Sequence, residues 1–163
     1  MTGRPGVVVI GLGNDFRRDD GAGPAVIERL RAKAPGGAEL LISDGEPGRL
    51  MEACAGASLA IVVDAVRAQP PTPGRLHRIV ADRLVAGQDA AGGHGAGLVG
   101  AASSHGLGLG DAIALASALG RLPERLIVHG VEADDLAPGT GLTPAVAGAL
   151  DALTAAVLRD IPG

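Results

Sequence analysis

The chain has 163 residues, a net charge of −4 and an aromatic content of 1%. That length fits a single domain over residues 1–163, and the acidic, aromatic-poor composition excludes a surface built to bind and stack nucleic acid. One cysteine excludes an internal disulfide, no apolar run approaches the roughly 20 residues of a membrane span, and no secretory signal is evident, so we expect a cytoplasmic protein with no membrane partner.

Apolar, β-branched runs alternate with helical patterns along the chain. The runs typical of strands buried on both faces lie at 7–10, 39–43, 59–64 and 125–131. Apolar residues at helical spacing lie at 22–34, around Leu50 to Cys54, at 106–119 and from Thr143 onward. Strands that alternate with helices predict an α/β protein with a parallel sheet covered on both faces.

Three segments depart from this simple alternation. Residues 74–80, GRLHRIV, alternate charged and apolar side chains as a half-exposed edge strand does. Residues 85–104 are rich in glycine and alanine and predict a flexible loop within the domain. The last helix is expected to begin with Thr143 as its N-cap and Pro144 at its first position.

Acidic residues follow the predicted strands. Asp19 and Asp20 come after the first strand, Asp44 after the second, Asp64 ends the third, and Glu132 follows the strand at 125–131. Each carboxylate alone is explained as a turn former or helix cap. Because ligands of open α/β sheets bind beyond the carboxyl ends of the strands, the acids together predict a working site at that edge.

The glycine turn at 11–13, GLG, admits more than one interpretation. It is similar to a dinucleotide-binding turn, with Asp44 in the place of the acid that binds a ribose hydroxyl. Phe16 stands where that motif has its third glycine, and Asp19 and Asp20 would put negative charge near a pyrophosphate. We therefore expect no nucleotide cofactor, and a purely architectural turn stays an alternative.

Asp20, Asp64 and His105 form a candidate metal site. A helix start stabilises a carboxylate, so we expect one of Asp19 and Asp20 to serve as a helix-start residue and the other to stay ionised as a ligand. Two carboxylates and an imidazole suit zinc, nickel or a similar divalent ion. No short spacing motif links the three residues, so the pattern alone leaves solvated or structural roles open.

The remaining candidate groups are expected to be structural. His129 lies in an apolar strand and is predicted to be a hydrogen-bonded interior residue, whereas His77 is predicted to lie at the surface. Cys54 falls in a helical pattern and is expected to pack in the core. No serine lies on a strand-to-helix elbow, so we expect no covalent nucleophile.

Five segments in order resemble the hydrogenase maturation peptidases, which remove the C-terminal extension of the large subunit of nickel-iron hydrogenases. These segments are VVVIGLGNDFRRDDGAGPAVIERL, the DG at Asp44 and Gly45, IVVDAV around Asp64, SSHGLGLGDAIALA around His105, and HGVEADDLAPGTGLTPAV. The likeness covers most of the chain. It implies a three-layer αβα, phosphorylase/hydrolase-like fold around a five-stranded, mostly parallel mixed sheet whose edge strand runs opposite to the rest.

The resemblance also implies roles for individual residues. By position, Asp20, Asp64 and His105 contact the metal, Asp20 and Asp64 are the catalytic carboxylates, and Asp44 with Gly45 binds substrate. The metal is nickel delivered by the substrate, which is the large-subunit precursor. The implied chemistry leaves two routes open: the metal polarises the peptide carbonyl, or a carboxylate activates the attacking water.

Two departures from the family pattern keep other functions in view. Glu46 stands where many relatives have a second glycine after the DG, and the glycine-rich stretch before His105 is longer than usual. These features favour, as an alternative, a nickel-binding accessory protein for hydrogenase assembly that does not cleave. A dinucleotide-dependent oxidoreductase is the third hypothesis.

Overall fold

The computed structural model describes residues 6–33, 36–80 and 109–163. The strands are β1 (Val7–Leu12), β2 (Ala38–Ser43), β3 (Leu59–Val66), β4 (Leu76–Val80) and β5 (Arg125–Glu132). The helices are the short 3₁₀ helix η1 (Arg18–Gly21), α1 (Ala22–Lys33), α2 (Pro47–Cys54), α5 (Leu109–Ala118) and α6 (Pro144–Asp160). The loop predicted at 85–104 and the candidate ligand His105 lie outside the described residues.

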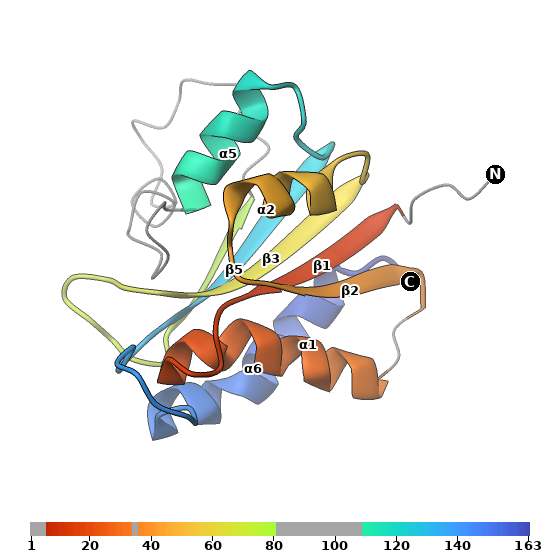
Figure 1. Ribbon diagram of the computed structural model, residues 1–163. Helices are drawn as coiled ribbons and strands as arrows, with labels where there is room; N and C mark the ends of the chain where they lie inside the picture. The colour runs from red at the N-terminus through yellow and green to blue at the C-terminus, as the bar shows by residue number, and fades with distance from the viewer. Residues whose placement is uncertain (1–5, 34–35, 81–108) are drawn as a thin grey trace.

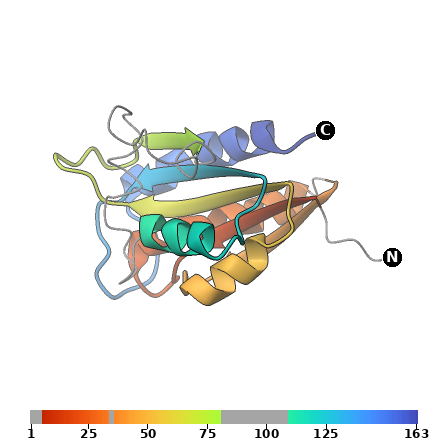
Figure 2. The same ribbon diagram turned by 90° about the horizontal axis from the view of Figure 1, so that it is seen from above.

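The strands form one five-stranded sheet in the order β2-β1-β3-β5-β4. β1 pairs in parallel with β2 and β3, and β3 pairs in parallel with β5. β4 pairs with β5 in the antiparallel sense, and Figure 2 shows it running against β3 and β5. The mixed sheet and the reversed edge strand at 74–80 are therefore confirmed.

Helices cover both faces of the sheet, as Figure 1 shows: α1 and α6 lie on one face, and α2 and α5 lie on the other. Alternate residues of β1 point to opposite faces, so Val9 packs with α1 and α6, whereas Val8 and Ile10 pack with α2 and α5. Each face carries its own aliphatic cluster. The three-layer αβα prediction is confirmed.

β2 differs from its prediction. Its apolar sequence predicts a strand buried on both faces, but β2 lies at an edge of the sheet and is half-buried along most of its length. Ile42 is 44% exposed. An apolar run indicates that a strand packs on a core, but it does not indicate how many strands pair with it. The sequence alone therefore does not place β2 at an edge of the sheet.

Two glycines bring α1 unusually close to the sheet. A Cβ atom on Gly11 of β1 would lie 2.4 Å from the carbonyl oxygen of Gly23 in α1. A Cβ atom on Gly23 would lie 2.3 Å from the carbonyl oxygen of Leu12 and 2.7 Å from that of Val63. The start of α1 therefore rests on the carboxyl ends of β1 and β3, which positions η1 at that edge of the sheet.

The last helix begins where the sequence predicts it. Thr143 occupies the N-cap position and Pro144 follows at the first helical position, although the Thr143 side chain makes no capping hydrogen bond. One face of α6 is buried through Val146, Leu150, Leu153 and Val157. Across the ranges that the structure describes, neither α6 nor any other helix is long and apolar enough to cross a membrane.

Candidate functional site

The glycine turn after β1 packs directly against the backbone of Asp20. Gly13 has a φ of +143°, and a Cβ atom there would lie 1.8 Å from the carbonyl oxygen of Asp20. The next residue, Asn14, donates its backbone N–H to Asp20 Oδ2 at 2.9 Å. The glycine is thus needed for a close approach of two backbone segments, and the turn holds the Asp20 carboxylate in place.

Phe16 does not make the close contact between helix and strand that the third glycine makes in a dinucleotide-binding turn. Its side chain is 71% exposed, and its backbone N–H donates to Asn14 Oδ1 at 2.8 Å. The close contact between helix and strand is made later, by Gly23. The position of Phe16 therefore has no part in the packing of α1 on the sheet.

Asp20 and Asp64 lie on neighbouring elements at the carboxyl edge of the sheet. Asp20 belongs to η1 and Asp64 to β3, which contact one another. Both residues are fully buried. In the register of the sheet Asp64 lies opposite Gly130 of β5, so this carboxylate sits near the centre of the strand order. A buried carboxylate needs a hydrogen-bond, ionic or metal partner, and Asp20 has one in the N–H of Asn14.

His105, the third predicted metal ligand, lies outside the described residues. Among residues 6–33, 36–80 and 109–163, no group of three His, Cys, Asp or Glu side chains could by itself hold a metal ion. Asp20 and Asp64 supply carboxylate oxygens, which suit a divalent ion when an imidazole completes the set. The proposed set therefore depends on His105.

Asp19 has a more extensive role than that of a helix-start residue. Its Oδ2 accepts the backbone N–H groups of Asp134 and Asp135, each at 2.9 Å. Its Oδ1 accepts the backbone N–H of Thr143 at 2.7 Å, and the Thr143 hydroxyl contacts both oxygens. Burial acts to raise the pKa of Asp19, but these hydrogen bonds outweigh it and lower the pKa. The side chain joins η1 to the loop between β5 and α6.

The predicted substrate contacts, Asp44 and Gly45, follow β2, with Asp44 exposed and Gly45 half-buried. Asp44 Oδ1 accepts the backbone N–H of Glu46 at 3.1 Å, and Asp44 Oδ2 pairs with the Arg49 guanidinium at 2.8 Å. The Glu46 N–H and the Arg49 charge lower the pKa of Asp44. Gly45 adopts a φ of +86°, which favours glycine. Asp44 thus has a local structural role in addition to the predicted contact.

Glu46 is the N-cap of α2. Its carboxylate accepts the backbone N–H groups of Gly48 at 3.0 Å and Arg49 at 2.9 Å, and these hydrogen bonds lower its pKa. Capping of this kind satisfies donors that a helix leaves unpaired at its start. The departure from the family pattern at this position therefore has a structural explanation.

Glu132 is directed to β4 and not into a shared acidic cluster. Its carboxylate contacts His77 Nε2 at 2.7 Å and accepts the backbone N–H of Thr72 at 2.8 Å. Burial would raise the pKa of Glu132, yet the His77 and Thr72 contacts lower it. Glu132 thus lies at the carboxyl end of its strand, as predicted, but its carboxylate is already paired with His77. His77, predicted at the surface, is half-buried.

His129 is a hydrogen-bonded interior residue, as predicted. Its Nε2 lies 2.7 Å from Asp160 Oδ2, and Arg78 donates to both Asp160 oxygens at 2.8 and 2.9 Å. Burial lowers the pKa of His129, although the contact with Asp160 opposes this shift. Cys54 is buried in the cluster beneath α2 and α5, which confirms its predicted place in the core.

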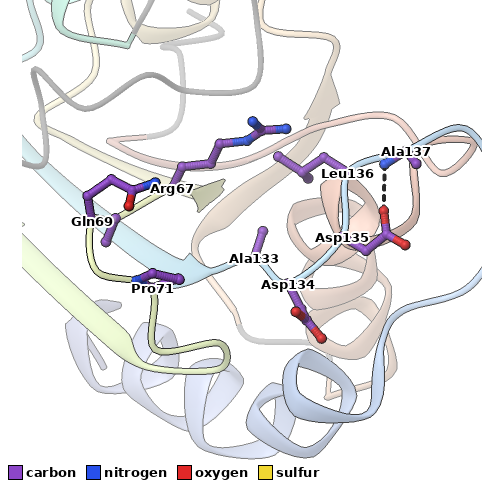
Figure 3. Close-up of a pocket in the computed structure, with 9 residues that line it drawn as sticks. Arg67, Gln69, Pro71, Ala133, Asp134, Asp135, Leu136 and Ala137 are labelled. Atoms are coloured by element: carbon purple, nitrogen blue, oxygen red, sulfur yellow. Dashed lines mark hydrogen bonds between the residues drawn. The ribbon is translucent and has the colours of Figure 1, made fainter.

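A pocket of about 460 Å³ opens at the same edge of the sheet, between the loops that follow β3 and β5. The β3 side supplies Arg67 and Gln69, and the β5 side supplies Asp134, Asp135 and Leu136 (Figure 3). No sequence motif marks these residues as a binding site. Their positions directly after two predicted strands are a usable signal, because that edge is where α/β folds bind ligands.

Comparisons with known proteins agree with this architecture. Residues 24–160 match a family model described as hydrogenase maturation protease, a range that contains Asp44, Asp64 and His105 and begins after Asp20. A relative, the hydrogenase 2 maturation protease of Escherichia coli K12, is 28% identical over 142 residues, which is 86% of this chain and 80% of the relative.

Solved structures of the same kind share the fold. The hydrogenase maturating endopeptidase HybD of E. coli superposes with a TM-score of 0.69 at 25% identity, covering 94% of this chain and 90% of that one. The [NiFe] hydrogenase maturation protease HybD of Thermococcus kodakarensis gives a TM-score of 0.71 at 22% identity, covering 94% of this chain and 97% of that one. The resemblance seen in the sequence is confirmed: this chain belongs to the hydrogenase maturation protease family.

Proposed function

We propose that this peptidase removes the C-terminal extension of a nickel-iron hydrogenase large-subunit precursor after nickel has been inserted. The observation that carries the proposal is the burial of Asp20 and Asp64 on contacting elements at the carboxyl edge of the sheet. Buried carboxylates at a ligand-binding edge are costly unless they are paired or bind a cation, so they favour a functional role. Membership of the family indicates peptide-bond hydrolysis, and we propose that it takes place at Asp20 and Asp64.

In this proposal nickel is part of the substrate. Asp20, Asp64 and His105 contact the nickel that the precursor carries, because two carboxylates and one imidazole suit a borderline divalent ion. The backbone N–H of Asn14 fixes Asp20 Oδ2, which limits the directions from which Asp20 can approach the metal. Contact with nickel then positions the peptide bond, so a precursor without nickel would be held poorly.

Peptide hydrolysis needs an activated water and a polarised carbonyl. Either the metal polarises the carbonyl while a carboxylate takes the proton of the water, or the metal serves in docking and Asp20 or Asp64 activates the water. Both routes use the same two carboxylates, and neither needs a covalent nucleophile. Cys54 does not compete for the role, because it is buried in the aliphatic cluster beneath α2 and α5.

Asp44 and Gly45 are proposed to contact the precursor backbone. They follow β2 at the same edge of the sheet as Asp20, and the Asp44 side chain is exposed there. Glu46 leaves these two residues available because its own carboxylate is directed into the start of α2. A cytoplasmic location, where such a precursor would be assembled, stays a prediction.

The proposal is tested by mixing the protein with nickel-loaded and nickel-free precursor and following the precursor mass. We expect the loaded form to lose its extension and the nickel-free form to stay intact. A loaded precursor that keeps its mass while it binds the protein would indicate the non-cleaving accessory role. Equal cleavage of both forms would exclude nickel as the condition for cleavage.

A further inference from the structure

The pocket of about 460 Å³ lies at the same edge of the sheet as Asp20 and Asp64, which do not line it themselves. Its first wall begins at Arg67, three positions after Asp64, which is about 10 Å along an extended chain. Its second wall contains Asp134 and Asp135, whose N–H groups bind Asp19, the neighbour of Asp20 in η1. Each wall of the pocket is thus connected through a few residues to one of the two carboxylates, and its volume lies in the range of about 300 to 1,000 Å³ that ligand pockets show.

Buried carboxylates hold both walls in place. Asp19 fixes the loop after β5, and the backbone N–H of Ala133 donates to the carbonyl of Val66 at 2.9 Å. Glu132 fixes the loop after β3, because its side chain accepts the N–H of Thr72 and its carbonyl accepts the N–H of Gly74 at 2.8 Å. A pocket whose walls are already ordered loses little conformational entropy when it binds a flexible peptide.

Arg67 is the positively charged group of this pocket and is available to a ligand. Asp135 is engaged already, since its Oδ1 accepts the N–H of Ala137 at 2.8 Å and its Oδ2 lies 3.5 Å from Arg18 Nε. Arg67 is exposed and makes no hydrogen bond or ion pair with the residues that the structure describes. In Figure 3 its side chain extends along the pocket toward Leu136, and the carboxylates of Asp134 and Asp135 point away from it.

We propose that this pocket binds the precursor segment next to the scissile bond, and that Arg67 selects a segment that carries a carboxylate. A guanidinium binds a carboxylate through two parallel hydrogen bonds, which gives both charge and geometric selection. Asp134 on the other wall repels a second carboxylate, so the segment has a preferred direction across the pocket. The inference rests on the proposed function, because it assigns the pocket to the same substrate.

The test measures kcat and KM for cleavage of nickel-loaded precursor by the wild type and by Arg67→Gln. We expect Arg67→Gln to raise KM by at least about tenfold with kcat unchanged, because it removes binding contacts and leaves the reacting groups alone. Arg67→Lys keeps the charge without the paired geometry and should fall between the two. Arg125→Gln, a change of the same charge at the far end of β5, is the matched control and should leave KM unchanged.

Two precursor variants distinguish the sources of the carboxylate. In one, the acidic side chains of the extension become amides; in the other, two added glycines displace the terminal carboxylate. The precursor variant that lacks the carboxylate bound by Arg67 should be cleaved by the wild-type enzyme with a raised KM. The same precursor variant should not raise the KM of the Arg67→Gln enzyme any further. If neither variant raises KM for the wild type, or if Arg67→Gln cleaves with unchanged KM, the proposal for the pocket is overturned while the peptidase proposal stands.

A binding measurement separates failure of the pocket from failure of the proposed function. A synthetic peptide with the extension sequence is titrated into the wild type and into Arg67→Gln, with no cleavage required. Weaker binding to Arg67→Gln by about tenfold supports the pocket even if the precursor is never cleaved. Equal binding to both proteins overturns it.

Discussion

Thr143 donates both its backbone N–H and its hydroxyl to the carboxylate of Asp19, with the nitrogen 2.7 Å from Oδ1 and the hydroxyl oxygen 2.8 Å from Oδ2. The two residues are 124 positions apart in the chain. The Thr143 hydroxyl is used in this contact and makes no capping hydrogen bond to the backbone of α6, which an N-cap threonine often makes. The contact joins the segment that carries Asp20 to the start of α6.

Asp19→Asn should lower the free energy of unfolding by about 3 kcal/mol, because an amide nitrogen cannot accept the N–H groups that Asp19 accepts. Urea unfolding followed by circular dichroism measures the change. Asp134→Asn is the control, since the Asp134 side chain is exposed, and it should change stability by no more than about 0.5 kcal/mol. Equal stability of Asp19→Asn and wild type would show that the hydrogen bonds of Asp19 contribute little.

Asp19 should also contribute to acid denaturation. Its pKa is lowered in the folded protein, so its stabilising contribution is complete above the ordinary carboxyl pKa near 4 and is lost as pH falls through the lower folded value. Unfolding midpoints measured from pH 6 to pH 2 should therefore fall more steeply for the wild type than for Asp19→Asn. Parallel curves for the two proteins would contradict this linkage.

His129 should make the protein less stable as pH falls from about 7 to 5. Its pKa is lowered mainly by burial, so the unfolded chain takes up a proton near pH 6.5 while the folded protein does not. The charged groups that face it, Arg78 of β4 and Asp160 with Arg159 of α6, keep their charges in this range. His129→Gln should flatten this part of the curve of Tm against pH, and an unchanged slope would assign the effect to other groups.

Gly13→Ala should prevent stable folding or cost more than about 3 kcal/mol, because its Cβ atom would overlap the carbonyl oxygen of Asp20 at 1.8 Å. Gly148→Ala is the matched control: Gly148 lies exposed in α6, and a Cβ atom there meets nothing within 4 Å. That change should raise stability by up to about 1 kcal/mol through helix propensity. Thermal unfolding of both variants tests the pair, and a stable, well-folded Gly13→Ala would refute the close approach.

Asp20→Asn, Asp64→Asn and His105→Ala should each lower precursor processing by at least about 100-fold while the folded content stays unchanged. The reason is that each removes one proposed nickel contact. Processing is followed by mass spectrometry and folding by circular dichroism, with Asp151→Asn on the exposed surface of α6 as the control. Normal processing by any of the three variants would remove that residue from the proposed set.

The sequence predicts the layers of the fold well because burial determines them. Continuous β-branched runs locate β1, β3 and β5, and the alternating charges at 74–80 locate the reversed edge strand. The edge position of β2 is not visible in its apolar sequence, because among the described strands β2 pairs with β1 alone while its side chains still pack on the core. A local sequence pattern indicates how apolar a segment is, whereas the pairing of strands depends on contacts between segments far apart in the chain.

The carboxylates were harder to assign for a related reason. Asp19 and Glu132 lie after or at the end of a strand, yet their roles depend on partners far along the chain, which are Thr143 for Asp19 and His77 for Glu132. No spacing rule reports these contacts. The resemblance to the family implies that Asp20 and Asp64 contact nickel. Both residues are buried on contacting elements at one edge of the sheet, and their role as nickel contacts stays a prediction.

The contacts of Asp19 with Asp134, Asp135 and Thr143 also set an order of events during synthesis on the ribosome. The turn that carries Asp20 is translated early, but the N–H groups that neutralise its buried neighbour emerge 115 to 124 residues later. Until then the turn lacks the groups that stabilise it in the finished protein. A nascent chain halted before Thr143 should therefore be sensitive to added protease at this turn, and completion of the last loop should protect it.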